Sequence, residues 1–164
     1  MSTDHYGPIA GRMIRAPMTD ITHEHLEART FHYIVRGIIR DGEHLLLCKQ
    51  RNDTYTFLPG GHVEFGEPAR VALAREIHEE LGIHCKVGKF VGALENGWDG
   101  QFELSLFFEM NDHGLTMKTT PQPASEAEAH LEFVWAKHDQ LAEVNIMPAM
   151  LHDWLECGGW GSTL

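Results

Sequence analysis

The sequence predicts an α/β fold in which a mixed β-sheet lies between helices. Apolar runs rich in Val, Ile, Leu and aromatic residues recur between polar turns, which is typical of strands. Two helical segments, Pro68–Leu81 and Met147–Cys157, interrupt or follow these runs. Because strands come before and between the two helices in this order, we expect the helices to cover both faces of the sheet.

The chain is long enough for one domain with its own core. Of its 164 residues, 43% are apolar and 23% are charged, which is ordinary for a globular protein. We expect residues 31–164 to form this domain and residues 1–30, which are polar and interrupted by Gly and Pro, to form an extension. Within the extension, Gly11–Met18 could form a short strand, and His23 and His25 are either a metal-binding pair or surface residues.

Three strands are expected before the first helix: Phe31–Arg40, Glu43–Lys49 and Tyr55–Leu58. The turn between the first two is predicted by Asp41-Gly42, a common hairpin dipeptide. Lys49 and Arg51 follow the second strand and lie close in sequence to a glycine-rich loop. They are candidates for contacts with substrate phosphates, or are charges at the end of a strand.

The glycine-rich loop, Pro59–Glu67, leads directly into the first helix. Gly60, Gly61 and Gly66 permit positive φ and close backbone approach, so the loop can fold tightly around a ligand. Pro68 suits the first helical position, and Gly82 is a common helix stop.

The helix has an acidic cluster made of Glu76, Glu79 and Glu80. We expect an apolar stripe to face the core and these carboxylates to lie nearly opposite it; the stripe is Val71, Ala74, Ile77 and Leu81. The cluster is either a solvated face or a site for a divalent cation. Glu79 and Glu80 lie in the last turn, where the helix dipole disfavours anions, and this favours the cation. Hard oxygen ligands of this kind suit Mg²⁺ or Mn²⁺.

Beyond the helix we expect a hairpin, a long loop and a further strand: Ile83–Leu94, Phe102–Met110, Asn111–Glu128 and His130–Ala136. Trp98 lies in the hairpin turn and is either a base-stacking residue or a packed loop aromatic. The long loop ends in the acidic residues Glu126 and Glu128. Lys137–Glu143 could form a short helix before the last one.

Composition limits the partners. The formal net charge of −11 argues against nonspecific binding to nucleic acid, although bound metal could offset this charge for a small anionic substrate. No run has the length of a membrane span, and no secretory signal is visible. Cys48, Cys85 and Cys157 are widely spaced, which is typical of free thiols. We therefore expect a cytoplasmic protein with no membrane or nucleic-acid partner.

The loop and helix together resemble the Nudix box, in which Gly, five residues, Glu and seven residues precede Arg-Glu-aliphatic-any-Glu-Glu-any-Gly-aliphatic. The matching positions are Gly61, Glu67, Arg75, Glu76, Ile77, Glu79, Glu80, Gly82 and Ile83. The resemblance implies an α/β/α sandwich and a hydrolase that cleaves a nucleoside diphosphate linked to another group X. It also implies Mg²⁺, with Mn²⁺ as an alternative, and is compatible with a homodimer.

The same resemblance implies roles for individual residues. Metal ligands would be the Gly60 carbonyl, the carboxylates of Glu76, Glu79 and Glu80, and a downstream glutamate, Glu128 or Glu126. Glu79 or Glu76 would also deprotonate the attacking water. Arg75 would orient Glu79, and Glu67 would support the loop. The candidate substrate-binding residues are Lys49, Arg51, Gly61 and Trp98.

The box does not name the substrate. Nucleoside triphosphates are the leading expectation, followed by ADP-ribose, nucleotide sugars and dinucleoside polyphosphates. Two hypotheses from other classes are a catalytically silent nucleotide sensor and a simple cation-binding domain. The first would usually have lost box carboxylates, all of which are present, and the second does not explain the glycine spacing.

Overall fold

The computed structural model describes residues 29–164, and the predictions for Gly11–Met18, His23 and His25 lie outside these described residues. The elements in chain order are β1 (Thr30–Ile38), β2 (Arg40–Asp41), β3 (His44–Gln50), α1 (Ala69–Leu81), β4 (Lys86–Trp98), β5 (Gln101–Asn111), β6 (Leu131–Lys137), the 3₁₀ turn η1 (His138–Gln140), α2 (Leu151–Cys157) and β7 (Gly159–Ser162).

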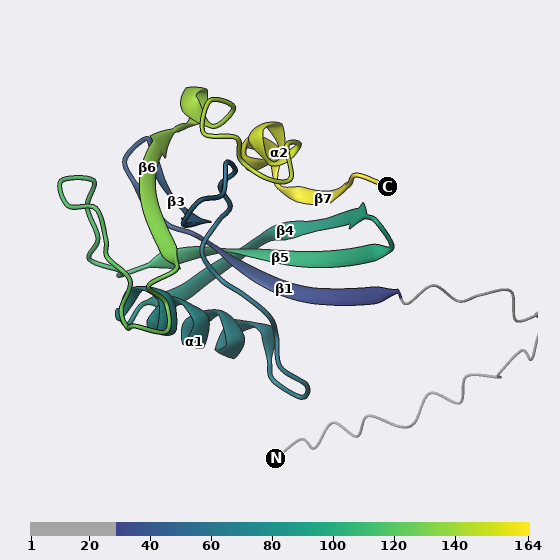
Figure 1. The fold of residues 1–164 in the computed structure, drawn as a ribbon, viewed down its shortest axis with the longest axis horizontal. Helices are drawn as coiled ribbons and strands as arrows, with labels where there is room; N and C mark the ends of the chain where they lie inside the picture. The colour runs from purple at the N-terminus through teal and green to yellow at the C-terminus, as the bar shows by residue number, and fades with distance from the viewer. Residues whose placement is uncertain (1–28) are drawn as a thin grey trace, which may run out of the picture.

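The strands form two sheets between the two α-helices (Figure 1). One is a mixed four-stranded sheet in the order β1-β5-β4-β7, where β4 and β5 make an antiparallel hairpin and β1 and β7 add in parallel. The other is antiparallel, in the order β2-β3-β6. Helices α1 and α2 lie on opposite sides of the strands. The predicted α/β class and sandwich arrangement are confirmed.

Each helix closes one hydrophobic core. Under α1, Leu73 and Ile77 pack in a cluster with Val35 of β1 and Phe108 of β5, and all four are buried. On the other side, Trp154 of α2 lies against a buried phenylalanine of β5, Phe107, with ring centroids 4.6 Å apart. Phe107 and Phe108 are neighbours on one strand, so their side chains point to opposite faces and serve the two cores in turn.

The predicted apolar stripe of α1 is confirmed at Ile77 and Leu81 but wrong at Val71, because the helix is rotated about its axis relative to the prediction. Val71 is 55% exposed, whereas Leu73, Ile77 and Leu81 are buried, together with Glu80. Leu73 and Ile77 are larger than Ala74 and bury more apolar area, so they determine which face turns inward. As a consequence, Glu80 does not share the solvent-facing side with Glu79 but points inward, toward the glycine-rich loop.

Several segments differ from the predicted ones. Tyr55–Leu58 forms only isolated bridges at Thr56 and Phe57, and the predicted helix over Lys137–Glu143 is reduced to the η1 turn. Strand β4 begins later and extends to Trp98, with register shifts before Gly92. Helix α2 begins at Leu151, and β7 was not predicted from the Gly-rich tail. No helix within residues 29–164 is long and apolar enough to cross a membrane.

Candidate active site

The glycine-rich loop lies on β1 and brings its backbone next to α1. Val35 donates its amide to the Gly61 carbonyl, 2.9 Å away, and Gly37 donates to the Pro59 carbonyl at 2.8 Å. Gly60 has φ +125, and a Cβ there would collide with the Val35 carbonyl. A Cβ on Gly61 would overlap the carboxylate of Glu76. Position 60 therefore has room for glycine only, and Gly61 leaves the space that the Glu76 side chain fills.

Glu80 is the buried carboxylate of the site, only 6% exposed. Its Oε2 accepts a hydrogen bond from the Gly60 amide at 3.1 Å. Burial raises the pKa of Glu80 to about 8; the charge of Arg36 and the Gly60 amide oppose this rise, and the charges of Glu76 and Glu128 add to it. Of the two downstream candidates, Glu128 thus acts on Glu80, whereas Glu126 is not among the groups that shift this pKa.

Arg75 connects the loop to the acidic cluster. Its Nε and Nη2 donate to the two carboxylate oxygens of Glu67, at 3.1 and 2.9 Å. Its Nη1 donates to Glu76 at 2.8 Å and to Glu79 at 3.1 Å. Nη2 also donates to the carbonyl of His62. The hydrogen bond from Arg75 lowers the pKa of Glu67, so this carboxylate stays ionised.

The oxygen atoms at this site suit a hard divalent cation as ligands, but most of them accept hydrogen bonds from other groups of the protein. Glu76 and Glu79 bind Arg75, Glu80 accepts from the Gly60 amide, and the Gly60 carbonyl accepts from Arg36 at 2.8 Å. Within residues 29–164, no three His, Cys, Asp or Glu side chains are arranged as a metal site. A buried carboxylate beside a glycine carbonyl and further carboxylates is nevertheless an oxygen-rich set of the chemical kind that suits Mg²⁺.

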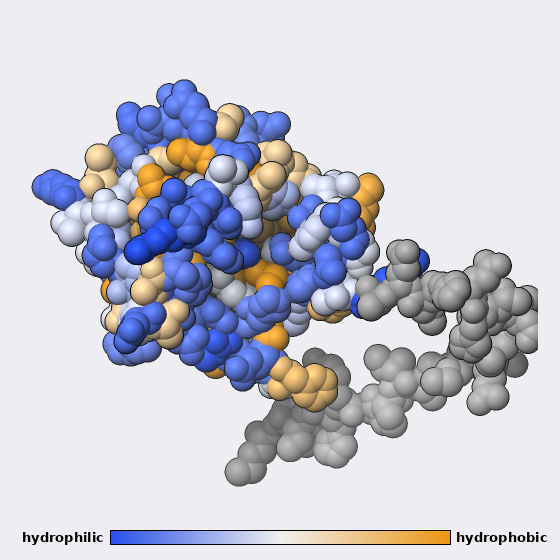
Figure 2. All heavy atoms as spheres, viewed as in Figure 1, coloured by the Kyte–Doolittle hydropathy of each residue, from blue (hydrophilic) through white to orange (hydrophobic). Residues whose placement is uncertain are grey.

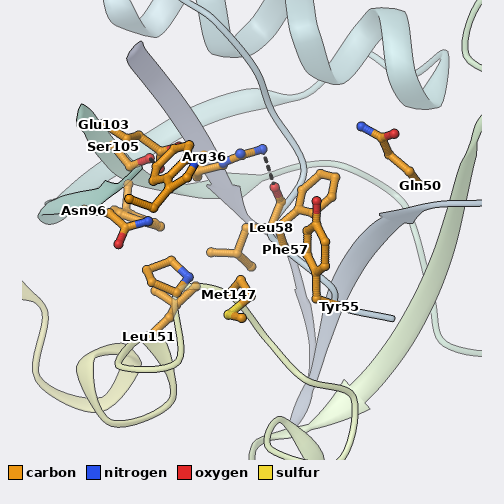
Figure 3. A pocket seen from close by; sticks show the side chains of 13 residues that line it. Arg36, Gln50, Tyr55, Phe57, Leu58, Asn96, Glu103, Ser105, Met147 and Leu151 are labelled. Atoms are coloured by element: carbon orange, nitrogen blue, oxygen red, sulfur yellow. Dashed lines mark hydrogen bonds between the residues drawn. The ribbon is translucent and has the colours of Figure 1, made fainter. Parts of the chain in front are cut away.

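A cavity of about 560 Å³ lies on the α2 side of the sheet (Figure 3). Apolar side chains of the second core form much of its wall, and Trp98, predicted to bind substrate, is among the lining residues. The thirteen lining residues are Arg36, Gln50, Tyr55, Phe57, Leu58, Asn96, Trp98, Glu103, Ser105, Phe107, Met147, Pro148 and Leu151. The box carboxylates are not among them. The cavity and the acidic cluster are therefore two separate parts of the candidate site.

Arg36 joins these two parts. It lines the cavity, and its Nη1 donates to the carbonyls of Leu58, at 3.0 Å, and Gly60, at 2.8 Å. Its guanidinium lies over the ring of Phe57, 5.0 Å from the centroid. Arg36 is not among the residues predicted from the sequence, although an arginine inside the apolar run Tyr33–Ile39 was a usable signal.

The polar lining residues of the hairpin were also missed. Asn96 and Trp98 alternate along β4, and Glu103 and Ser105 alternate along β5, so that all four lie on the face that meets the cavity. This period of two was present in the sequence. What it could not give is the pairing register, which places Asn96 directly opposite Glu103.

Lys49 and Arg51 do not line the cavity. Both pair with Glu132 across the β3–β6 ladder, with N–O distances of 3.2 Å and 3.6 Å. Trp98 instead stacks on His32, with ring centroids 5.9 Å apart, and remains 45% exposed. Trp98 is thus the predicted substrate-binding side chain that the fold brings to the cavity.

Comparison with known sequences agrees with the family resemblance of the glycine-rich loop and α1. A family model for the NUDIX domain matches residues 30–154. A CTP pyrophosphohydrolase of Escherichia coli is 31% identical over 121 residues, which cover 71% of this chain and 83% of that protein. An ADP-ribose pyrophosphatase of Methanocaldococcus jannaschii is 43% identical over 65 residues, 38% of each chain.

Solved structures share the fold. The E. coli ORF135 protein superposes with a TM-score of 0.58 at 24% identity, covering 79% of this chain and 89% of that one. A MutT protein from Methanosarcina mazei gives 0.62 at 22% identity, covering 78% and 92%. Together with the family model, which spans both the cavity and the box helix, these matches show that the chain belongs to the Nudix family and is a Nudix hydrolase.

Proposed function

We propose that this protein is a metal-dependent pyrophosphohydrolase of nucleoside triphosphates, releasing pyrophosphate by attack of water on the phosphate chain. The observation that carries the proposal is the position of Arg36. Its side chain lines the cavity and also binds the Gly60 carbonyl at the acidic cluster. A nucleoside in the cavity would therefore extend its phosphates past Arg36 toward the box carboxylates.

The residues that would hold the metal are Glu76, Glu79 and Glu80, with the Gly60 carbonyl and Glu128. A divalent ion bound there would polarise a phosphoryl oxygen and lower the pKa of bound water. The buried position of Glu80, beside Gly60 and under the influence of Glu76 and Glu128, supports this set. The protein's own contribution would be to hold these oxygens together on the far side of Arg36 from the cavity, so that the phosphate chain is oriented between them.

The base that accepts the proton from water would be Glu79 or Glu76. Glu79 is the more exposed of the two, with 50% of its side chain accessible compared with 18% for Glu76, and Arg75 contacts both. We favour Glu79 because water can reach it directly. Arg75 would act as a positioning residue that sets the orientation of both carboxylates.

The relatives support a nucleotide substrate but differ in which one they name. CTP pyrophosphohydrolase matches across most of its length, whereas ADP-ribose pyrophosphatase matches over a much shorter stretch. This difference favours a nucleoside triphosphate. ADP-ribose, nucleotide sugars and dinucleoside polyphosphates are the alternative substrates.

We also propose a cytoplasmic location, which is supported by the three free cysteines in residues 29–164.

The test is hydrolysis of a panel containing nucleoside triphosphates, ADP-ribose, nucleotide sugars and dinucleoside polyphosphates, with Mg²⁺, with Mn²⁺ and with chelator. Pyrophosphate and phosphate release are measured for the wild type and for a Glu79→Gln, Glu80→Gln double variant. A matched control is Glu43→Gln, which changes an exposed glutamate remote from the box whose one ion pair within residues 29–164 is with Lys137.

The expected result is metal-dependent release of pyrophosphate from triphosphates, lost in the double variant and retained in the control. If only ADP-ribose or a nucleotide sugar is hydrolysed, the assignment as a hydrolase stands and the assignment of a triphosphate substrate is wrong. Binding of a nucleotide without any turnover would favour the sensor hypothesis.

A further inference from the structure

One end of the cavity carries polar side chains with unused hydrogen-bonding capacity (Figure 3). Glu103, Ser105 and Asn96 gather there, away from Tyr55 and Phe57. None of these three residues belongs to the acidic cluster or to the loop. Their arrangement decides what kind of group can fill that end of the cavity.

Glu103 offers a fixed hydrogen-bond acceptor. Ser105, itself only 2% exposed, donates its hydroxyl to Oε1 of Glu103 at 2.7 Å. This bond occupies one carboxylate oxygen and fixes the orientation of the group. Within residues 29–164, the other oxygen, Oε2, receives no hydrogen bond and no ion pair. A hydrogen-bond donor on a ligand in the cavity can pair with this half-buried acceptor.

Asn96 offers a donor beside that acceptor. It lies on β4 directly opposite Glu103 of β5 in the antiparallel register, where Cβ atoms are about 4.5–5.5 Å apart. Its Oδ1 accepts from the hydroxyl of Thr163 at 2.7 Å, which leaves the Nδ2 amide group directed to the cavity. In the described part of the chain, Nδ2 has no acceptor.

We propose that Glu103 and Asn96 select nucleotides whose base carries an exocyclic amino group, and discriminate against uracil and thymine. The inference rests on the proposed function, because it assumes that the cavity holds the base. Cytosine and adenine present an amino donor beside a ring-nitrogen acceptor, and guanine presents ring and amino donors beside a carbonyl. Each pattern complements one carboxylate oxygen and one amide group.

Uracil and thymine can pair with this acceptor and donor through their ring N–H and one carbonyl, but their second carbonyl then lies beside the carboxylate. Their one ring N–H lies between two carbonyls, so a carboxylate that accepts from it meets at least one carbonyl oxygen without a donor. Asn96 can donate to one of the two carbonyls, and the other remains opposed to negative charge. A polar group left unpaired in a half-buried site costs binding free energy, and specificity follows from this difference.

The test compares kcat/KM for CTP and UTP, which differ at this edge of the base, in the wild type, Glu103→Gln and Asn96→Leu. We expect the wild type to prefer CTP by about ten-fold or more. Glu103→Gln should reduce this ratio to near one, because the Gln amide can also donate to a carbonyl. Glu109→Gln, an exposed glutamate on the same strand, should leave the ratio unchanged. Partial unfolding lowers both rates equally and cannot change the ratio.

Equilibrium binding of CMP and UMP, without metal, separates this inference from the proposed hydrolysis. Tighter binding of CMP that is lost in Glu103→Gln supports the selectivity even if no triphosphate is turned over. Turnover of CTP and UTP at equal rates overturns the selectivity and leaves the hydrolase intact. Failure to bind either monophosphate, or a CMP preference that survives Glu103→Gln, also overturns it.

Discussion

Arg75 binds Glu67 through two parallel hydrogen bonds, from Nε at 3.1 Å and from Nη2 at 2.9 Å. Glu67 precedes α1 and Arg75 lies in its second turn, so the pair ties the end of the loop to the helix. The same guanidinium contacts Glu76 and Glu79. The loop and the acidic cluster therefore share the Arg75 guanidinium. A substitution at Glu67 that moves this guanidinium changes the hydrogen bonds of both Glu76 and Glu79.

Glu67→Gln should lower kcat for the proposed reaction by about ten-fold to a hundred-fold, the usual effect of losing a residue that orients metal ligands. Without a full charge at Glu67, the Arg75 fork loses its two-point partner and no longer sets the orientation of Glu76. Steady-state kinetics measure kcat and KM separately. The matched control is Arg70→Gln on the same helix. In the described part of the chain, the Arg70 guanidinium donates to the Val87 and Gly88 carbonyls and lies over the ring of Phe108, and it has no ion pair with a carboxylate. Equal losses in both variants would contradict the orienting role.

Alanine at Gly60 and at Gly61 should have different effects. At Gly60 a Cβ meets the backbone of β1 at positive φ, so Gly60→Ala should destabilise the fold by about 1–3 kcal/mol. At Gly61 the Cβ meets only the carboxylate end of Glu76, a flexible side chain that can move. Gly61→Ala should therefore keep most of the stability and lose activity.

Urea unfolding followed by circular dichroism gives the two stabilities, and kinetics on the folded variants give the activities. A Gly61→Ala protein with wild-type kcat would show that the position of Glu76 does not matter for the reaction. A stable Gly60→Ala protein would show that the loop can move away from β1.

The local parts of this site were predictable from the sequence, and the long-range parts were not. Glu76, Glu79 and Arg75 lie within one helical turn or so of each other, so their spacing alone predicts the Arg75–Glu79 pair that the structure contains. The link from Arg36 to Gly60 spans 24 positions and depends on how the loop lies against β1. No periodicity encodes such a contact.

The rotation of α1 about its axis shows a second limit. Alanines at 69, 72 and 74 make the helix weakly amphipathic, so two overlapping stripes were compatible with the pattern. Packing against Val35 and Phe108 selected the stripe of Leu73 and Ile77 and turned Glu80 inward. Three carboxylates that look equivalent in the sequence therefore have three different environments.

Lys49→Ala and Arg51→Ala should leave KM within about two-fold of the wild type. Both side chains pair with Glu132, and neither lines the cavity. Exposed ion pairs of this kind contribute about 0–1 kcal/mol, so stability should change little as well. KM for the best triphosphate is the measurement. A rise in KM of ten-fold or more in either variant would support the contact with substrate phosphates that was predicted from the sequence.

Glu80 should make stability depend on pH in the absence of metal. In the folded protein, burial raises its pKa from 4.5 to about 8, so between these values the folded state holds a proton that the unfolded state has released. The free energy of unfolding therefore falls as pH rises from 4.5 to 8, by up to about 5 kcal/mol at roughly 1.4 kcal/mol per pKa unit. Glu80→Gln keeps an acceptor for the Gly60 amide and removes the titrating carboxyl group. The free energy of unfolding of this variant should therefore change less with pH than that of the wild type.

Urea unfolding in chelator at pH 5, 6, 7, 8 and 9 tests this dependence for the wild type and Glu80→Gln. The two curves should converge at low pH and separate toward pH 9, with the variant the more stable protein there. Adding Mg²⁺ should reverse the order at high pH if Glu80 is a ligand, because a cation replaces the proton as the partner of the buried carboxylate. Parallel curves across the whole range would mean that Glu80 is ionised in the folded protein, paired well enough with Arg36 and Gly60 to offset its burial.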